Sequence, residues 1–260
     1  MLYVLSFSGG LDSTSLLLHL LCKKELVYAV SFDYGQKHKI ELEFAKRNID
    51  YLQSHGFNIT HKIVDLSSLV SLLQSSLTDP NIDIPEGHYM DKTMKSTFVP
   101  NRNAIFSSII YAYAISLHKK TKNDVSICLG VHSGDHLIYP DCRPEFYKSI
   151  INSFDLGNWD SKHIDTYLPY INFSKSKIIK DGIESSDKLK LDFNTIYKNT
   201  LTTYSPDTQG RSNGKTGSDV ERILSFNEIG IQDPGLYTQT WENLVEYAMQ
   251  CDKKIDLKNQ

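Results

Sequence analysis

Cysteine pairs and long apolar runs are both missing from this sequence of 260 residues. The cysteines lie far apart and form no Cys-x-x-Cys pair, which argues against a disulfide framework or a zinc knuckle. We expect reduced thiols at Cys22, Cys128, Cys142 and Cys251. No stretch approaches the roughly 18 to 20 consecutive apolar residues that cross a bilayer. Residues 1–5 carry no basic leader. We therefore expect a cytoplasmic protein with no membrane partner.

A strong charge of either sign is missing as well. The formal net charge is −3 and the isoelectric point is about 6.3, which argues against strong nonspecific binding of nucleic acid. Apolar residues make up 40% of the chain and charged residues 23%, as in ordinary globular proteins. A chain of this length buries a full core, as one large domain or as one domain with a small appendage.

The sequence does contain an alternation of short apolar runs with helical patterns. Short, mostly apolar runs predict strands at residues 2–6, 27–32 and 124–131, and residues 59–64 also look like a strand. The helical patterns lie at residues 15–21, 40–52 and 105–117. Because strands that alternate with helices at this spacing form parallel βαβ units, we predict an α/β fold with a doubly wound, mainly parallel sheet. Ligands of such sheets bind at the carboxyl ends of the strands.

Three segments depart from this alternation. Residues 75–96 contain Pro80, Pro85 and several acidic residues, which is typical of a mobile loop or lid. Residues 200–218 are dense in Thr, Ser, Gly and Asn and predict weak structure. The apolar spacing of residues 238–249 predicts a C-terminal helical extension, whereas residues 253–260 are expected to fray.

A motif rich in glycine and hydroxyl groups, SGGLDST, occupies residues 8–14 between the first predicted strand and the first helix. Two glycines let the backbone approach a phosphate, and the start of a helix presents unpaired N–H groups to it. Ser8, Ser13 and Thr14 add hydroxyl donors, while Asp12 is able to cap the helix or to help bind Mg²⁺. The pattern favours phosphate binding over an ordinary capped turn.

This motif resembles the SGGxDS signature of the PP-loop ATP pyrophosphatases, which release AMP and pyrophosphate from ATP. It differs from the Walker pattern, whose Gly-Lys-Ser/Thr ending is absent here. The resemblance implies an adenine nucleotide alpha hydrolase-like fold. It also implies an ATP site made of Phe7, Ser8, Gly9, Gly10, Leu11, Asp12, Ser13, Thr14, Phe32 and Lys175.

Three further segments resemble the 7-cyano-7-deazaguanine synthases, a family within that group. They are SFDYGQKH at residues 31–38, VPNRN at residues 99–103 and YPDCRPEF at residues 139–146. These enzymes adenylate 7-carboxy-7-deazaguanine, form its amide with ammonia and use a second ATP to dehydrate the amide to a nitrile. The resemblance implies a C–N bond-forming ligase that uses ATP and Mg²⁺. It implies Asp12, Arg102 and Lys175 as catalytic residues, with Asp12 as a candidate magnesium ligand.

The matched segments also make chemical sense. The guanidinium groups of Arg102 and Arg143 suit a carboxylate or phosphate, and Lys175 matches the lysine that neutralises departing pyrophosphate in the family. Each residue alone is equally consistent with a surface ion pair or a helix cap, but the ordered set favours a site. The expected substrate-binding residues are Tyr34, Gln36, Arg102, Asn103, His132, Asp135, Tyr139, Asp141 and Arg143.

The resemblance fails at the zinc site that the synthases carry near the C-terminus. Its four cysteine positions fall near Ser205 and on Asn213, Thr216 and Asp219. A tetrahedral Cys₄ site does not survive that replacement, so we predict no structural zinc. Residues 200–218 must then be held by hydrogen bonds or by a partner, or else stay mobile.

A second departure follows the strand predicted to end at residue 131. The synthases usually have Asn-Ala-Val-Asp-Tyr-Ser-Gly there, whereas this chain has HSGDHLI at residues 132–138. Asp135 is kept. His132 is a candidate general base for an attacking amine, or a structural hydrogen-bonded histidine. Both departures favour a remodelled acceptor pocket, and hence transfer of the acyl group to a protein amine, as in anti-phage defence relatives of the synthases.

Three other functions remain open. The chain is alternatively a zinc-free nitrile-forming synthase, an inactive nucleotide-binding scaffold or a tRNA-modifying PP-loop enzyme. The last would need a basic face or sulfur-carrying cysteines, and neither is evident. We expect a PP-loop nucleotide-binding domain at residues 1–199 and a C-terminal region at residues 200–260. The resemblance also implies a homodimer or a hetero-complex.

Overall fold

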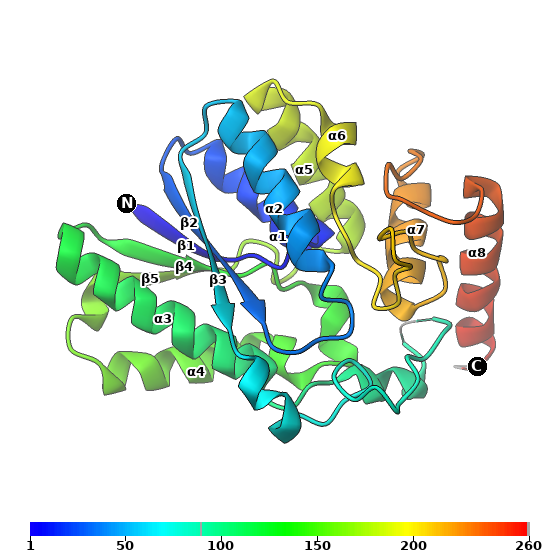
Figure 1. The fold of residues 1–260 in the computed structure, drawn as a ribbon, viewed down its shortest axis with the longest axis horizontal. Coiled ribbons are helices and arrows are strands. Elements are labelled where there is room, and N and C mark those ends of the chain that lie inside the picture. Colours follow the sequence, from blue (N-terminus) through cyan, green and yellow to red (C-terminus); the bar gives the residue numbers. More distant parts are fainter. Residues whose placement is uncertain (89, 259–260) are drawn as a thin grey trace.

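The computed structural model describes residues 1–88 and 90–258 and contains a five-stranded sheet between two layers of helices (Figure 1). Every neighbouring pair of strands is parallel. The strands, in the spatial order β3-β2-β1-β4-β5, are β1 (Leu2–Ser6), β2 (Leu26–Asp33), β3 (Ile59–Asp65), β4 (Val125–Cys128) and β5 (Ile164–Tyr167). The predicted α/β fold with a doubly wound parallel sheet is therefore confirmed.

The helices cover both faces of this sheet. One face carries α1 (Leu11–Leu21), α2 (Glu41–Ser54), α5 (Lys175–Leu189) and α6 (Phe193–Lys198), and the other carries α3 (Arg102–Thr121) and α4 (Pro144–Gly157). The two C-terminal helices, α7 (Gly217–Glu228) and α8 (Trp241–Lys258), lie side by side at one end. No helix in the described part of the chain is long and apolar enough to cross a membrane.

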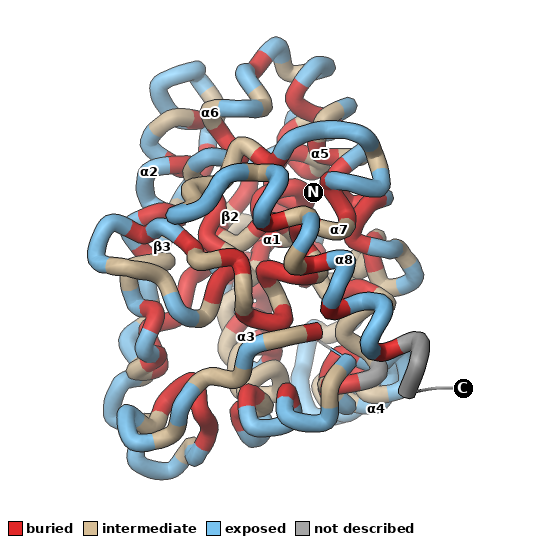
Figure 2. The backbone as a smooth tube through the Cα atoms, turned by 90° about the vertical axis from the view of Figure 1, so that its right-hand side faces the viewer, coloured by how far each residue is buried: buried red, intermediate tan, exposed pale blue. Residues whose placement is uncertain are grey.

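The side chains of β1 alternate between two cores. Tyr3 and Leu5 pack with residues of α1, α2 and α5, whereas Leu2 and Val4 pack with residues of α3. All four side chains are buried, and Figure 2 colours such residues red along the backbone. Because both faces of the strand are covered, it reads as a continuous apolar run in the sequence.

The order of the strands reverses beside β1. The chain continues from β1 to β2 and β3 on one side of the sheet, and then crosses to β4 and β5 on the other. The connections that leave the carboxyl ends of β1 and β4 therefore run to different sides and open a crevice between them. The glycine-rich motif directly follows β1, so the topology places it at this crevice.

Several boundaries differ from those predicted. Helix α1 begins four residues early because Gly10 itself is its N-cap. Strand β4 ends at Cys128 because Leu129, Gly130 and Val131 leave the sheet to line a cavity. The structure also has β5, α4, α5, α6 and α7, where no element was predicted. β5 is an edge strand of only four residues, IDTY, none of them fully buried, so it lacks an apolar run.

The segment predicted to be weakly structured, residues 200–218, has no helix or strand before α7 but is held by hydrogen bonds. Asp219 accepts the Thr203 hydroxyl at 2.8 Å and the Thr216 hydroxyl at 2.5 Å, and its carboxylate also caps α7. Two of the four positions that match the zinc-site cysteines of the synthases, Thr216 and Asp219, thus come together, with Thr203 rather than Ser205 as the third. Hydroxyls around one carboxylate do not form a thiolate zinc site.

The second anchor of this region is a buried arginine on α7. Arg222 is 2% exposed and donates to both carboxylate oxygens of Asp233, at 2.6 and 2.8 Å. It also donates to the hydroxyls of Thr200 and Thr202, at 2.8 and 2.9 Å. These bonds join the start of the irregular segment, and the chain that follows α7, to the helix.

The C-terminal helix is longer than predicted. α8 packs through Leu244, Ala248 and Cys251 against Val220 and Ile223 of α7. A helix was predicted at residues 238–249, and the structure has one from Trp241 to Lys258. The expectation that residues 253–258 fray is therefore wrong, because the buried Ile255 extends the packed face of the helix. Residues 259 and 260 lie outside the described residues.

We predict that replacing Arg222 with Met lowers the free energy of unfolding by about 3 to 5 kcal/mol, because the substitution leaves the carboxylate of Asp233 buried without its partner. The matched control is Arg211→Met. Arg211 pairs with Asp207 at 2.7 Å, but its side chain is 44% exposed, so the loss is at most about 1 kcal/mol. Urea unfolding of both variants makes the comparison. Equal losses for the two would contradict the anchoring role of Arg222.

Candidate active site

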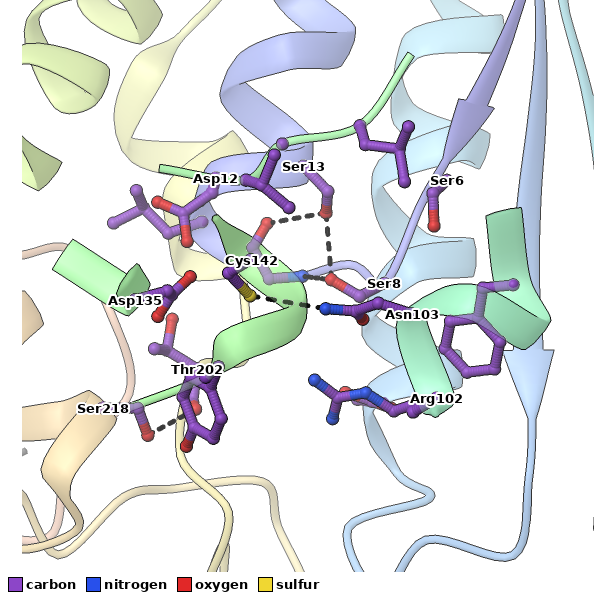
Figure 3. Close-up of a pocket in the computed structure, with 18 of the residues that line it drawn as sticks. Ser6, Ser8, Asp12, Ser13, Arg102, Asn103, Asp135, Cys142, Thr202 and Ser218 are labelled. Atoms are coloured by element: carbon purple, nitrogen blue, oxygen red, sulfur yellow. Dashed lines mark hydrogen bonds between the residues drawn. The ribbon is translucent and has the colours of Figure 1, made fainter. Parts of the chain in front are cut away.

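A cavity of about 250 Å³ opens at the carboxyl ends of β1, β2 and β4 (Figure 3). Its walls come from segments far apart in the sequence, including α1, α3 and α7. Thirteen of the residues predicted for the ATP and substrate sites line it: Phe7, Ser8, Gly10, Leu11, Asp12, Ser13, Phe32, Tyr34, Arg102, Asn103, Asp135, Tyr139 and Lys175.

The glycine-rich loop has the geometry of an anion cradle. Gly9 has φ of +80°, and a Cβ there would lie 2.7 Å from that of Ala45, so only glycine fits. Gly10 is the N-cap of α1 and its N–H points to the Ser8 hydroxyl at 3.2 Å. Gly10 has no side chain with which to cap the start of α1. Its first N–H groups therefore face the cavity mouth, where a phosphate would satisfy them.

A buried cluster of charges lies beside this loop. The Lys175 ammonium, 5% exposed, is 2.6 Å from a carboxylate oxygen of Glu221 and 3.4 Å from one of Asp12. Burial lowers the pKa of Lys175, but Asp12, Glu221 and Asp135 outweigh that effect and raise it. The pKa of Asp135 is raised by burial, with His132 acting in the opposite direction. Lys175 is therefore a permanent positive charge at the loop.

His132 lies behind this cluster and is 1% exposed. Its Nδ1 accepts the N–H of Gly134 at 3.1 Å, so in the neutral ring the proton is on Nε2. That nitrogen is 3.4 Å from an oxygen of Asp135 and 3.8 Å from one of Asp12. A ring that already carries its proton on the cavity side donates rather than accepts there. The geometry thus favours the structural alternative for His132 over the general base.

The opposite wall is aromatic and carries a partly buried cation, Arg102. Phe32 and Phe106 stack with centroids 4.0 Å apart, and Tyr34 meets Phe106 edge-on. Burial raises the pKa of Tyr34 to about 12, although Arg102 lowers it. Burial also lowers the pKa of His38 to about 3, with Arg102 acting in the same direction. A flat, apolar wall beside a guanidinium suits a planar ring that carries an anionic group.

Six predicted residues do not line the cavity. Gly9 shapes the loop, and Thr14 is fully buried in α1. Gln36 accepts the Tyr34 N–H at 2.9 Å and donates to Glu41 at 2.8 Å, so it supports the wall. The remaining members are His132, described above, Asp141, which faces the Asn103 N–H at 3.4 Å, and Arg143, which is exposed and donates to the His136 carbonyl at 2.8 Å.

The sequence analysis missed several lining residues. Phe106 lies three positions beyond the VPNRN segment, one helical turn from Asn103, so its position on the same face was a usable signal. Glu221 gave no local signal, because the segment before it was expected to be weakly structured. Other residues missed on the lining include Glu41, Thr202, Tyr204 and Ser218.

The sequence profile described as "Queuosine biosynthesis protein QueC" matches residues 2–230. A 7-cyano-7-deazaguanine synthase of Caldicellulosiruptor bescii is 39% identical over 96% of this chain and 98% of its own length. The synthase 1 of Colwellia psychrerythraea is 41% identical over 89% and 96%, and the synthase of Methanoregula boonei is 42% identical over 89% and 96%.

Two solved structures are more remotely similar. An NMN synthetase from Francisella tularensis has a TM-score of 0.40 and 16% identity, with 97% of this chain and 85% of that one covered. A 4-thiouridine synthetase in complex with RNA has a TM-score of 0.44 and 18% identity, with 96% and 53% covered. No functional inference rests on these two likenesses.

The ionisation of Glu41 leads to a prediction of how the free energy of unfolding depends on pH. Burial raises its pKa from 4.5 to about 7, although the hydrogen bond from Gln36 and the charge of Arg102 lower it. A raised pKa means that the folded state binds more protons, so the contribution of Glu41 to stability is lost as the pH rises through 7. The Glu41→Gln side chain cannot ionise. At pH 8 this variant should unfold at higher urea concentrations than the unmodified protein, and its free energy of unfolding should be higher by roughly 1 to 3 kcal/mol.

At pH 4.5 the same substitution should change little, because Glu41 is then protonated in the folded protein. The control is Glu43→Gln on the same helix, where the side chain is 69% exposed. This control should show no comparable pH-dependent difference. A gain for Glu41→Gln that is the same at both pH values would contradict the raised pKa.

Proposed function

This chain belongs to the queuosine biosynthesis QueC family, and we propose that it uses ATP to adenylate 7-carboxy-7-deazaguanine and then joins the acyl group to an amine. The single observation that carries the proposal is the placement of Lys175 beside the glycine-rich loop, in a cavity at the carboxyl ends of β1 and β4. An ATP-dependent ligase of this type needs a phosphate cradle and a fixed cation at one point.

In the proposed first step a carboxylate oxygen of the substrate attacks the α-phosphorus of ATP, and pyrophosphate leaves. The N–H groups at the start of α1 and the hydroxyls of Ser8 and Ser13, 3.1 Å apart, are suited to the β- and γ-phosphates. Lys175 stabilises the charge that builds up on the departing pyrophosphate. Because Lys175 is buried, water is excluded from around it. The electrostatic interaction between the ammonium and the pyrophosphate is therefore stronger than it would be in water.

Asp12 fits a magnesium ligand in this scheme. Its Oδ1 is buried and has no hydrogen-bond partner among the described residues, and carboxylate oxygens are the ligands that Mg²⁺ prefers. A bound Mg²⁺ would neutralise phosphate charge. Lys175 and Asp12 are 3.4 Å apart, so the chain's own cation and the proposed metal ligand would act on the same phosphates.

The base and its carboxylate fit the aromatic wall. A planar deazaguanine would lie near Phe106 and Tyr34, and Arg102 would pair with the carboxylate before adenylation. Burial lowers the pKa of Arg102, but Tyr34 and Tyr204 outweigh that effect and raise it. A guanidinium that is already desolvated and oriented loses little freedom when the substrate binds.

In the second step an amine nitrogen attacks the acyl carbon, AMP leaves and the nitrogen loses a proton. The relatives, 39 to 42% identical over nearly their whole lengths and named 7-cyano-7-deazaguanine synthases, favour ammonia as that amine. We propose nitrile formation as the principal activity. A second ATP would then dehydrate the amide, with the amide oxygen leaving on AMP.

The second candidate acceptor is a protein amine of a defence system. It is supported by the departure of residues 132–138, HSGDHLI, from the sequence usual in the synthases, since Asp135 of this segment lines the cavity. The hydrogen-bonded segment 200–218 borders the same side, through Thr202 and Ser218. Two other functions are kept as outcomes of the experiments below: an inactive nucleotide-binding scaffold and a tRNA-modifying enzyme.

We predict that Lys175→Met lowers the rate of AMP formation by roughly 100-fold or more, because it removes one preorganised charge from the site. The matched control is Lys177→Met. Lys177 lies in the same first turn of α5 but is exposed, near the ring of Phe173, and its loss should leave the rate unchanged. The two variants are compared by incubating each with Mg-ATP and 7-carboxy-7-deazaguanine and measuring the released AMP by chromatography. Equal rates would refute the catalytic role of Lys175.

The acceptor is identified by mass spectrometry of the base in the same reaction, with and without ammonium. We expect the nitrile to accumulate only when ammonium is present. An adenylate that persists with ammonium present would instead point to a protein amine, and candidate proteins would be searched for the added mass. No AMP under either condition would leave the scaffold as the explanation, and salt-dependent binding of tRNA would support the RNA-modifying enzyme.

A further inference from the structure

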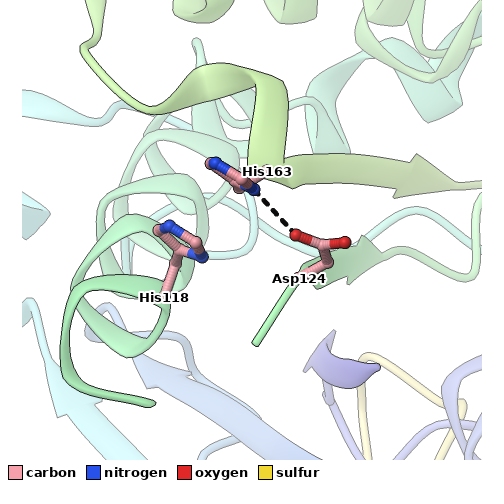
Figure 4. A group of neighbouring side chains, drawn as sticks. All are labelled: His118, Asp124 and His163. Carbon is pink, nitrogen blue, oxygen red and sulfur yellow. Dashed lines mark hydrogen bonds and ion pairs between the residues drawn. The ribbon is translucent and has the colours of Figure 1, made fainter. Parts of the chain in front are cut away.

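A group of metal-binding side chains lies away from the cavity: His118, Asp124 and His163 (Figure 4). Each offers one ligand atom, and these atoms all lie within 4.8 Å of one another. His118 is in the last turn of α3, Asp124 directly precedes β4, and His163 directly precedes β5. The group is therefore at the amino ends of the strands, whereas the cavity is at their carboxyl ends.

His118 is oriented as metal-bound histidines usually are. It is 8% exposed, and its Nδ1 is 2.8 Å from the carbonyl oxygen of Asn123. Since a carbonyl only accepts, Nδ1 carries the proton and Nε2 keeps a free lone pair. A ligating histidine typically donates its other N–H to a carbonyl or carboxylate in this way, which fixes the ring and raises its basicity.

Asp124 and His163 supply the other two ligands and can be reached from solvent. The His163 Nδ1 is 2.8 Å from an oxygen of Asp124, and the two side chains are 35% and 62% exposed. The rings of His118 and His163 stack 4.1 Å apart at 12°. Parallel rings direct their lone pairs side by side, so one ring must turn before both can bind one ion. His163 is the freer ring, because it ends a short exposed turn while Asn123 holds His118.

We propose that His118, Asp124 and His163 form a binding site for a divalent transition metal of the Zn²⁺ class, with water as the remaining ligand. Two imidazoles and one carboxylate suit Zn²⁺, Ni²⁺ or Co²⁺ rather than Mg²⁺ or Ca²⁺, which prefer oxygen. Three protein ligands leave one position of a tetrahedral site for solvent.

The site would link the end of α3 to the chain entering β4 and β5. An ion bound only by the folded protein stabilises that protein by mass action, so the site is structural and independent of the reaction proposed above. The site also lies in another part of the chain than the positions compared above with a Cys₄ zinc site, because it involves no residue of the segment 200–218.

The test uses the full-length, untagged protein after removal of metals by chelation. Zn²⁺ is titrated by calorimetry, Co²⁺ by visible absorption, and thermal unfolding is followed with and without Zn²⁺. The variants are Asp124→Asn and His163→Asn, whose side chains are 62% and 35% exposed, and neither substitution should affect folding. The control is His55→Asn, because His55 is an exposed histidine at the end of α2.

We expect one ion per chain, with a rise in the melting temperature. Each of the two variants should bind at least about tenfold more weakly and lose most of that rise, whereas the His55 control should behave as the unmodified protein does. Binding that is unchanged in both variants would place the ion elsewhere and overturn the proposal. Absence of Zn²⁺ and Co²⁺ binding by the unmodified protein would overturn it equally.

Discussion

The buried ammonium of Lys175 lies among carboxylates that come from separate parts of the fold. Asp12 lies in the first turn of α1, Asp135 follows β4, and Glu221 lies in the second turn of α7. Lys175 itself begins α5, so a single charge joins four segments at the carboxyl edge of the sheet. A lysine that loses its water in this way is tolerable only because these carboxylates replace that water. The position of the cation, and with it the phosphate site, therefore depends on the position of each of these segments.

The placement of α7 is the least obvious of these requirements. Glu221 reaches Lys175 only if α7 begins where it does, and the helix is set by the bonds of Asp219 to Thr203 and Thr216 and by the Arg222–Asp233 pair. Hydroxyls, one carboxylate and one guanidinium hold this segment against α7. The same segment also meets residues 75–96, since the Gly87 N–H bonds to the Lys215 carbonyl at 2.9 Å. The C-terminal region is thus part of the construction of the site.

Local patterns in the sequence were enough to predict the sheet and the phosphate loop. Three of the five strands are mostly apolar runs, and the glycines of SGGLDS report a close approach of the backbone that no other residue permits, as Gly9 against Ala45 illustrates. Long-range consequences could not be predicted in the same way. Nothing near Glu221 in the sequence indicates that it meets Lys175, and Arg143 was expected at the substrate because spacing does not reveal that its side chain turns outward. The roles of these residues remain predictions.

The central claim is that the carboxylate of 7-carboxy-7-deazaguanine attacks the α-phosphorus of ATP in this cavity. It is tested most directly with substrate whose carboxylate carries oxygen-18. If an acyl adenylate forms and an amine then displaces AMP, one labelled oxygen stays on the phosphorus, and mass spectrometry finds it in AMP. Label in inorganic phosphate, with ADP as the other product, would mean attack on the γ-phosphorus instead. That result would contradict both the role assigned to the glycine-rich loop and the assignment of Lys175 to departing pyrophosphate.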